Sequence, residues 1–217
     1  MHPVLFKIGP LTLTCFGLMA ACGYLSAILF CYKTKDFRGI TTDNIADLTF
    51  VSMLSGIIGA RVFYVVQFWN QFEYNPTKIF RVDEGGLVFY GGFIFALIGI
   101  YIYCRKKKLS VLGVFDACAP CLALGHAFGR IGCFLNGCCY GEPCNLPWGV
   151  QFPEGSMPFK SYPFRKIHPV QLYESLFNLF LAFFLFHILK RKKSEGIVAG
   201  AYLISYGTAR FLLEFIR

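Results

Sequence analysis

The chain is dominated by long apolar runs, each close to the length of a helix that crosses a membrane. Such a helix needs roughly 20 apolar residues to cross about 30 Å of hydrocarbon. The runs cover residues 11–32, 45–69, 87–104, 109–129, 170–189 and 197–216. Only 15% of the 217 residues are charged, whereas about a quarter are charged in a typical soluble domain. The sequence therefore predicts an all-α polytopic membrane protein with about six transmembrane helices in a single membrane domain.

The basic residues gather after every second apolar run. A net charge of +9 in a soluble protein would suggest a nucleic-acid partner, but the positive-inside rule explains basic loops beside membrane spans. We therefore expect no nucleic acid, cytoplasmic basic loops, and an outer location for both termini and for segment 130–168. The basic loops contain Lys33, Lys35 and Arg38, then Arg105, Lys106, Lys107 and Lys108, then Lys190, Arg191, Lys192 and Lys193.

Several ionisable residues lie inside the predicted spans, where they are expensive and usually functional. One polar stripe with i, i+4 spacing runs along the last span: Tyr202, Tyr206, Arg210 and Glu214. Arg210 and Glu214 of this stripe are close enough to form an ion pair. The alternative reading is an ion pair that only holds two helices together. On the fifth span a second polar face combines Gln171, Glu174 and Asn178.

Three arginines in or beside the membrane need anionic partners, because arginine does not lose its proton in proteins. They are Arg61, Arg130 and Arg210, and the two glutamates of the polar faces can neutralise only some of them. A phosphate group entering from the outer leaflet would supply the remaining charge, since the guanidinium fork binds phosphate oxygens in a bidentate manner. The sequence thus favours a site for a lipid headgroup, with membrane lipids as partners.

The stretch GGLVFYGGF, from Gly85 to Phe93, opens the third span with two glycine pairs around Tyr90. Glycines at a helix entry allow close backbone approach and leave amide groups available for an anion. The alternative is that Gly91 and Gly92 only permit close helix packing.

Ten cysteines are present, and most lie in apolar runs as small hydrophobic residues. Cys121 belongs to a small-residue stripe on the fourth span and is predicted to pack against another helix. Four cysteines near the outer surface have the arrangement C-x4-C-C-x4-C: Cys133, Cys138, Cys139 and Cys144. Zinc sites favour C-x2-4-C pairs, so this spacing predicts no metal site. One disulfide on the oxidising side stays open as an alternative.

Five blocks in order resemble one protein family. The stretch GRIGCFLNGCCYG, from Gly129 to Gly141, is similar to the signature of the prolipoprotein diacylglyceryl transferases. The blocks IGARVFYV, GGLVFYGGF, RKIHPVQLYES and YGTARFLLEFIR are similar to other blocks of that family. Together they extend over nearly the whole chain.

The resemblance implies transfer of the diacylglyceryl group from phosphatidylglycerol to the lipobox cysteine of a prolipoprotein signal peptide, with glycerol phosphate released. It implies no cofactor and no metal, and a site on the outer face of the bacterial cytoplasmic (inner) membrane. Arg130 is implied to hold the lipid phosphate, Arg210 to be a second catalytic arginine, and Tyr90 to act on the headgroup. The other implied substrate-binding residues are Arg61, Gly91, Gly92, Asn136, Gly137, Gly141, His168, Gln171, Glu174, Tyr206 and Glu214.

The chain departs from the family pattern in three places. Tyr90 stands where some members carry a histidine considered a proton acceptor, and Cys133 and Cys138 stand where many members carry Asn and Glu. The family usually has seven transmembrane helices, and this sequence stops at Arg217. Two alternative functions therefore stay open: a membrane thiol/disulfide exchange protein, and a lipid-binding relative without catalysis.

Overall fold

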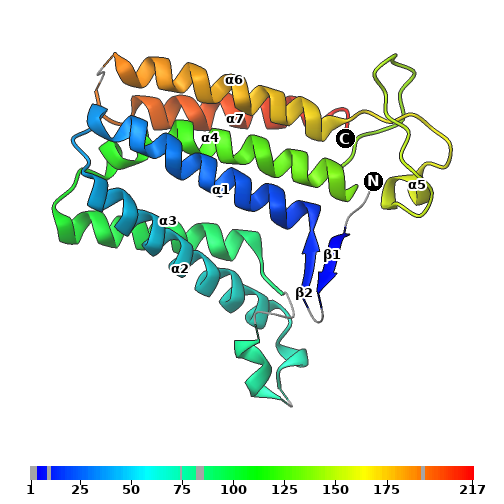
Figure 1. The fold of residues 1–217 in the computed structure, drawn as a ribbon, viewed down its shortest axis with the longest axis horizontal. Helices are drawn as coiled ribbons and strands as arrows, with labels where there is room; N and C mark the ends of the chain where they lie inside the picture. The colour runs from blue at the N-terminus through cyan, green and yellow to red at the C-terminus, as the bar shows by residue number, and fades with distance from the viewer. Residues whose placement is uncertain (1–3, 9–10, 74, 82–85, 192–193) are drawn as a thin grey trace. The chain divides into compact units, whose positions relative to one another are not determined.

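The protein is described by a computed structural model that covers residues 4–8, 11–73, 75–81, 86–191 and 194–217. Within these ranges the chain is mainly helical and has one β-hairpin (Figure 1). The helices are α1 Cys15–Thr34, α2 Thr42–Gln67, α3 Phe89–Lys107, α4 Val111–Asn136, α5 Met157–Ser161, α6 Val170–Lys190 and α7 Ile197–Glu214. Short 3-10 helices occupy Lys35–Phe37, Trp69–Gln71 and Pro76–Phe80. Gly85, Lys192 and Lys193, which belong to the sequence predictions, lie outside the described residues.

The predicted fold class, an all-α polytopic membrane protein, is confirmed. Four helical segments within the described residues are long and apolar enough to cross a membrane, judged by length and composition. They are Cys15–Phe37, Thr42–Gln67, Val111–Asn136 and Val170–Lys190. The helices α3 and α7 coincide with the ranges 87–104 and 197–216, and their crossing of the membrane stays a prediction.

The N-terminal part of the first predicted span is a strand rather than a helix. Strand β2 (Leu11–Thr14) pairs antiparallel with β1 (Val4–Ile8). Helix α1 then begins at Cys15, because the Thr14 hydroxyl accepts a hydrogen bond from the Gly17 amide at 3.0 Å. A threonine in this position satisfies a free amide of the first helical turn.

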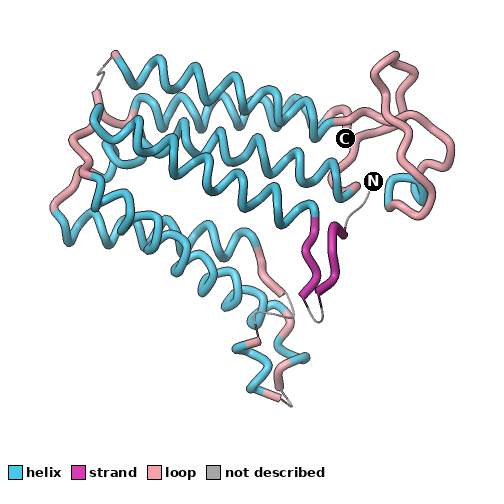
Figure 2. Tube along the Cα trace, in the orientation of Figure 1, coloured by secondary structure: helices cyan, strands magenta, loops and turns pink. Residues whose placement is uncertain are grey.

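Helix α4 continues to Asn136, seven residues beyond the predicted end at 129. A Cβ at Gly132 would lie 3.1 Å from the Cβ of Met19 on α1, so this glycine permits close helix packing. Arg130 therefore lies on the last turns of a helix and not in the outer segment. The long connection of residues 137–169 that follows is mostly loop (Figure 2) and contains α5.

The chain forms two compact units, one of residues 1–38 and 115–217 and the other of residues 39–114. In the first unit the core lies between α4, α6 and α7, where Ala119 and Ala123 face larger side chains. A Cβ at Gly23 of α1 would lie 2.9 Å from the Gly125 carbonyl oxygen of α4. The Cys121 thiol is buried and lies 3.7 Å from the Thr34 hydroxyl of α1, which agrees with its predicted packing against another helix.

In the second unit α2 and α3 pack through small residues on both helices. A Cβ at Gly91 would lie 2.5 Å from the Gly59 carbonyl oxygen, and one at Gly92 would lie 3.0 Å from the Gly56 carbonyl oxygen. Gly91 has no room for a side chain, and Gly92 has little. Gly91 and Gly92 therefore bring two helix backbones together, as small residues do in membrane helices.

A buried carboxylate at the start of α4 connects three parts of the first unit. Asp116 is fully buried, and its Oδ2 lies 2.6 Å from Nη2 of Arg38. It also accepts hydrogen bonds from the amides of Gly196 at 2.9 Å and Ala199 at 2.8 Å. These amides belong to the N-terminus of α7, which favours negative charge. Asp116 therefore fixes the position of α7 along its axis.

Replacing Asp116 by Ala should lower the free energy of unfolding by about 3–5 kcal/mol, because it removes the carboxylate of a buried ion pair and the acceptor of the Gly196 and Ala199 amides. The measurement is denaturant unfolding of the detergent-solubilised protein. Asp36→Ala is the control, because Asp36 is 75% exposed and pairs with Lys35; it should cost about 0–1 kcal/mol. Equal stabilities of the two variants would contradict the role given to Asp116.

Candidate active site

Glu174 lies at the centre of a polar group formed by three helices of the first unit. Its side chain is 3% exposed, and its Oε1 lies 2.9 Å from Nη2 of Arg130 on α4. The same oxygen accepts a hydrogen bond at 3.0 Å from the hydroxyl of Tyr206 on α7. The polar faces predicted for the fifth and sixth spans therefore point inward and meet.

The position of Glu174 is fixed by neighbours on the same buried face of α6. Gln171 and Asn178, one turn to either side, are also buried. Asn178 donates to the Glu174 carbonyl oxygen at 2.8 Å, and Ser175 donates to the Ala127 carbonyl oxygen of α4 at 2.9 Å. The Ser175 bond holds α6 against α4 at the level of the polar group.

Arg130 retains hydrogen-bonding capacity after pairing with Glu174. Its Nε is buried and has no hydrogen-bond partner among the described residues. A guanidinium has five N–H donors, and Glu174 engages it at Nη2. Arg130 can therefore bind a further anion without losing its carboxylate.

Arg210 lies one turn beyond Tyr206 on α7 and forms an ion pair with Glu214, as its i, i+4 spacing predicted. Glu214 is 61% exposed and also lies 3.7 Å from Nη1 of Arg217. This pair is more exposed than that of Arg130. Tyr202 stacks on Tyr206, with ring centroids 5.8 Å apart, and completes the polar stripe.

His126 is a member of this group that the sequence predictions missed. Its Nε2 lies 3.4 Å from the Tyr206 hydroxyl and 3.8 Å from Oε1 of Glu174. The signal was present, because His126 precedes Arg130 by four residues within an apolar run and therefore faces the same side of α4. A neutral imidazole at this place can accept a proton.

The other predicted residues of the outer segment shape its fold. Asn136 ends α4, and Gly137 follows with φ +74°. The Gly137 and Cys138 amides donate to the Phe134 and Cys133 carbonyl oxygens at 3.1 Å each, which is a Schellman helix end.

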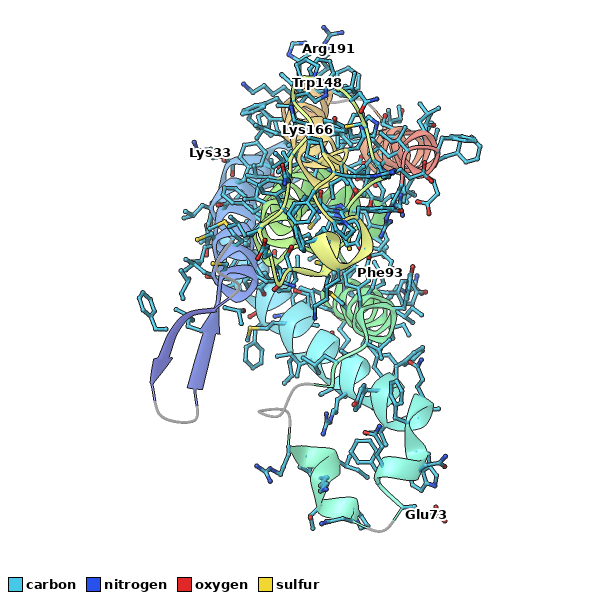
Figure 3. All side chains as sticks on the ribbon, turned by 90° about the vertical axis from the view of Figure 1, so that its right-hand side faces the viewer. Lys33, Glu73, Phe93, Trp148, Lys166 and Arg191 are labelled. Atoms are coloured by element: carbon cyan, nitrogen blue, oxygen red, sulfur yellow. The ribbon has the colours of Figure 1, made fainter. Side chains whose placement is uncertain are left out.

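Gly141 and His168 lie where the long connection meets the C-terminus. The Gly141 amide donates to the His168 carbonyl oxygen at 3.2 Å, and the Glu142 amide donates to the Ile216 carbonyl oxygen at 3.0 Å. A Cβ at Gly141 would lie 2.6 Å from that Ile216 oxygen. The His168 ring lies 3.3 Å from the Tyr173 hydroxyl. Trp148, labelled with Lys166 on this connection in Figure 3, donates to the same hydroxyl at 2.8 Å.

Arg61, in the second unit, has backbone carbonyl oxygens as acceptors. It donates to those of Lys78, Ile79, Arg81 and Gly86 at 2.6–3.0 Å. Its guanidinium also lies over the rings of Tyr64 and Phe72. Arg61 therefore holds the segment before α3 against α2.

Tyr90, on the first turn of α3, is 73% exposed and contacts the Phe89 ring.

Three of the outer cysteines form one group. The Sγ atoms of Cys133, Cys138 and Cys139 all lie within 4.8 Å of one another. A hydrogen bond from the Cys133 thiol lowers the pKa of Cys138 to about 5. All ten cysteines of the chain are free thiols in the structure. The C-x4-C-C spacing did not indicate this grouping.

Comparisons with known proteins indicate one family. The sequence profile of the family described as prolipoprotein diacylglyceryl transferase matches residues 3–217. The phosphatidylglycerol–prolipoprotein diacylglyceryl transferase of Clostridium tetani is 39% identical over 217 residues, covering all of this chain and 86% of the relative. The relative of the same name from Pseudoalteromonas translucida is 37% identical, and the one numbered 2 from Clostridium perfringens is 35% identical. All of this chain aligns with 80% and 84% of these two.

The chain belongs to the prolipoprotein diacylglyceryl transferase family. The resemblance seen in the five sequence blocks is thereby confirmed, and the chain is a multi-pass membrane protein.

Replacing Glu174 by Gln should lower the free energy of unfolding by about 3–5 kcal/mol, because Arg130 is left without a counter-charge in a buried place. Denaturant unfolding in detergent measures this change. Glu214→Gln removes a carboxylate that is mostly exposed and should cost about 0–1 kcal/mol. If both variants lost the same stability, Glu174 would not be the centre of the group.

Proposed function

We propose that this chain transfers the diacylglyceryl group of phosphatidylglycerol to the lipobox cysteine of prolipoproteins, at the outer face of the bacterial cytoplasmic membrane. The observation that carries the proposal is the contact of the buried Glu174 with Arg130 and Tyr206 in a member of this family. The basic loops support this orientation. They follow the first, third and fifth apolar runs, whereas the long connection follows the fourth run, so the two lie on opposite sides of the membrane if each run crosses it.

In the proposed reaction the cysteine sulfur attacks the glycerol carbon that carries the phosphate ester. A carbon–sulfur bond forms, the carbon–oxygen bond breaks, and the electron pair leaves on glycerol phosphate. Negative charge therefore moves from the thiolate to the leaving phosphate. Fixed cations directed at that phosphate lower the barrier, because they are already in place when the charge develops.

Arg130 is suited to hold this phosphate because it is fixed by Glu174 and still has an unpartnered Nε–H. Arg210 is suited to meet the developing charge, because its partner Glu214 is exposed and screened by solvent. In this function Glu174 and Tyr206 orient Arg130 and do not touch the reacting atoms.

The thiol must lose a proton before it attacks, since the thiolate is the nucleophile. His126 is the group placed to accept it, because its Nε2 lies in the polar group that holds Arg130. A neutral imidazole can accept a proton at neutral pH, whereas tyrosine has an unperturbed pKa of about 10. Tyr90 is then a hydrogen-bond donor to the headgroup.

The two alternative functions find less support. A thiol/disulfide exchange protein would use the outer cysteines, and a non-catalytic relative would keep the arginines without turnover. The curated relatives carry the name of the transferase. Incubation with labelled phosphatidylglycerol and a lipobox peptide separates the three functions. The transferase attaches label in a thioether that reductant does not release, the exchanger makes a disulfide that reductant cleaves, and the lipid-binding relative attaches nothing.

Arg130→Ala and Arg210→Ala should each reduce transfer at least tenfold, because one hydrogen bond to a charged group contributes about 1.5–3 kcal/mol. Lysine at either position should rescue poorly, since it cannot make the bidentate contact. The assay is the initial rate of peptide labelling, with folding checked by unfolding in detergent. Arg165→Ala, in the exposed part of the long connection, is the control. A wild-type rate in either Ala variant would refute the phosphate-binding role.

Tyr90→Phe should slow transfer only about three- to tenfold, the loss of a neutral hydrogen bond of about 0.5–1.5 kcal/mol. His126→Asn should slow it by about 10²–10⁴-fold, as removal of a general base does. His187→Asn is the matched control, because His187 lies in the last turn of α6, at the other end of the helix from Glu174. A Tyr90→Phe protein without turnover, together with a wild-type rate still rising toward pH 10, would assign the base to Tyr90 instead.

A further inference from the structure

The group of Cys133, Cys138 and Cys139 is not used by the proposed reaction. The three sulfur atoms lie within 4.8 Å of one another, at the outer end of α4 and the turn that follows it. Each residue is half-buried. Three thiols whose sulfur atoms come together on one short segment need a physical explanation.

The backbone around the group is shaped so that the sulfur atoms converge. The Cys138 amide bonds to the Cys133 carbonyl oxygen at 3.1 Å, which returns the chain over the last turn of α4. Cys139 has φ +59°, a conformation that costs a non-glycine residue energy. Neighbouring side chains in an extended chain point to opposite sides, whereas this turn brings the Cys138 and Cys139 sulfur atoms together.

The turn is also fastened to α6. The Nε2 of Gln171 donates to the Cys138 carbonyl oxygen at 2.7 Å, and Gln171 is 1% exposed. A buried side chain therefore holds the loop that carries two of the three sulfur atoms. Backbone strain that the surroundings maintain is a frequent sign of a functional site.

The spacing of the sulfur atoms suits a soft metal ion. Zinc binds thiolates at about 2.3 Å in a tetrahedron, so the ligand sulfur atoms of such a site lie roughly 3.8 Å apart. The distances between the sulfur atoms, which are at most 4.8 Å, would therefore need to shrink by only about 1 Å for zinc to bind. Thiolate ligands select zinc and other thiophilic ions over magnesium or calcium.

We propose that Cys133, Cys138 and Cys139 bind one zinc ion as three thiolates. No fourth His, Cys, Asp or Glu side chain belongs to the group in the part of the chain that the structure describes. The fourth ligand therefore comes from outside the group, as a water molecule or an external thiol. Cys144, the remaining outer cysteine, is not a ligand.

Metal binding would also protect the three thiols from oxidation at this place. If the long connection faces the oxidising side of the membrane, as the proposed function has it, free thiols there tend to form disulfides. A disulfide would join two of the three sulfur atoms and leave the third unpaired. A bound zinc ion engages all three sulfur atoms. The metal site does not depend on the transfer activity.

The test uses the full chain in detergent, prepared with reductant and chelator, and then titrated anaerobically with Co²⁺ as a spectroscopic probe. We expect stoichiometric binding with thiolate-to-cobalt charge-transfer absorption and the strong visible bands of tetrahedral cobalt, both removed by Zn²⁺. Replacing any one of Cys133, Cys138 and Cys139 by Ser should weaken cobalt binding and lower the charge-transfer absorption per bound cobalt, because one cobalt–sulfur bond is lost. Cys144→Ser should leave both unchanged.

Two results would overturn the proposal. One is cobalt binding without the charge-transfer band, or with the same band in the Cys133→Ser protein. The other is a disulfide between two of the three cysteines, found by mass spectrometry of protein alkylated without reductant. Unfolding in detergent confirms that each Ser variant is folded. The peptide-labelling assay is separate, so its failure bears on the proposed function and not on the metal site.

Discussion

The structure of the first unit depends on the burial of one carboxylate, that of Glu174. A charge away from water is tolerated only when donors surround it, and here they come from two other helices through Arg130 and Tyr206. The helices α4 and α7 must therefore approach α6 at one level. The same requirement that keeps the carboxylate satisfied also places a guanidinium near the C-terminal end of α4, where the proposed function has the headgroup phosphate bind.

A second carboxylate, that of Asp116, fixes α7 from its other end. Its bonds to the Gly196 and Ala199 amides set where α7 begins, and a helix rises 1.5 Å per residue. The distance along α7 from this anchor to Tyr206 and Arg210 is therefore determined by chain length alone. Two buried carboxylates thus hold one helix at two levels, and the arginine that the proposed reaction needs lies one turn beyond the second level.

The features that could be predicted from the sequence were those that depend on residues close together in it. The apolar runs gave the helices, and i, i+4 spacing gave the pair of Arg210 and Glu214. The carbonyl partners of Arg61 were not predictable, because they belong to residues 78–86, well after it in the chain. The cysteine group was missed for another reason: its geometry depends on a positive φ at Cys139, which residue spacing does not reveal. His126 could have been found, since an ionisable residue within an apolar run is rarely without a role.

The ion pairs of Arg130 and Arg210 differ in how firmly they are held. This difference suits the binding of one anion by first one arginine and then the other. Arg130 is paired with a carboxylate that three helices enclose, so separating them would leave buried charges and cost several kcal/mol. Arg210 is paired with Glu214, whose exposure means that water can replace the arginine at about 0–1 kcal/mol. Without a lipid, neither guanidinium is an unpaired charge, which keeps the site stable. In the proposed function, Arg130 would supply further donors to a bound phosphate while it stays in place, and Arg210 would exchange one partner for another at little cost. A site built from two firmly held pairs would resist the anion, and one built from two unpaired arginines would destabilise the helices that form it.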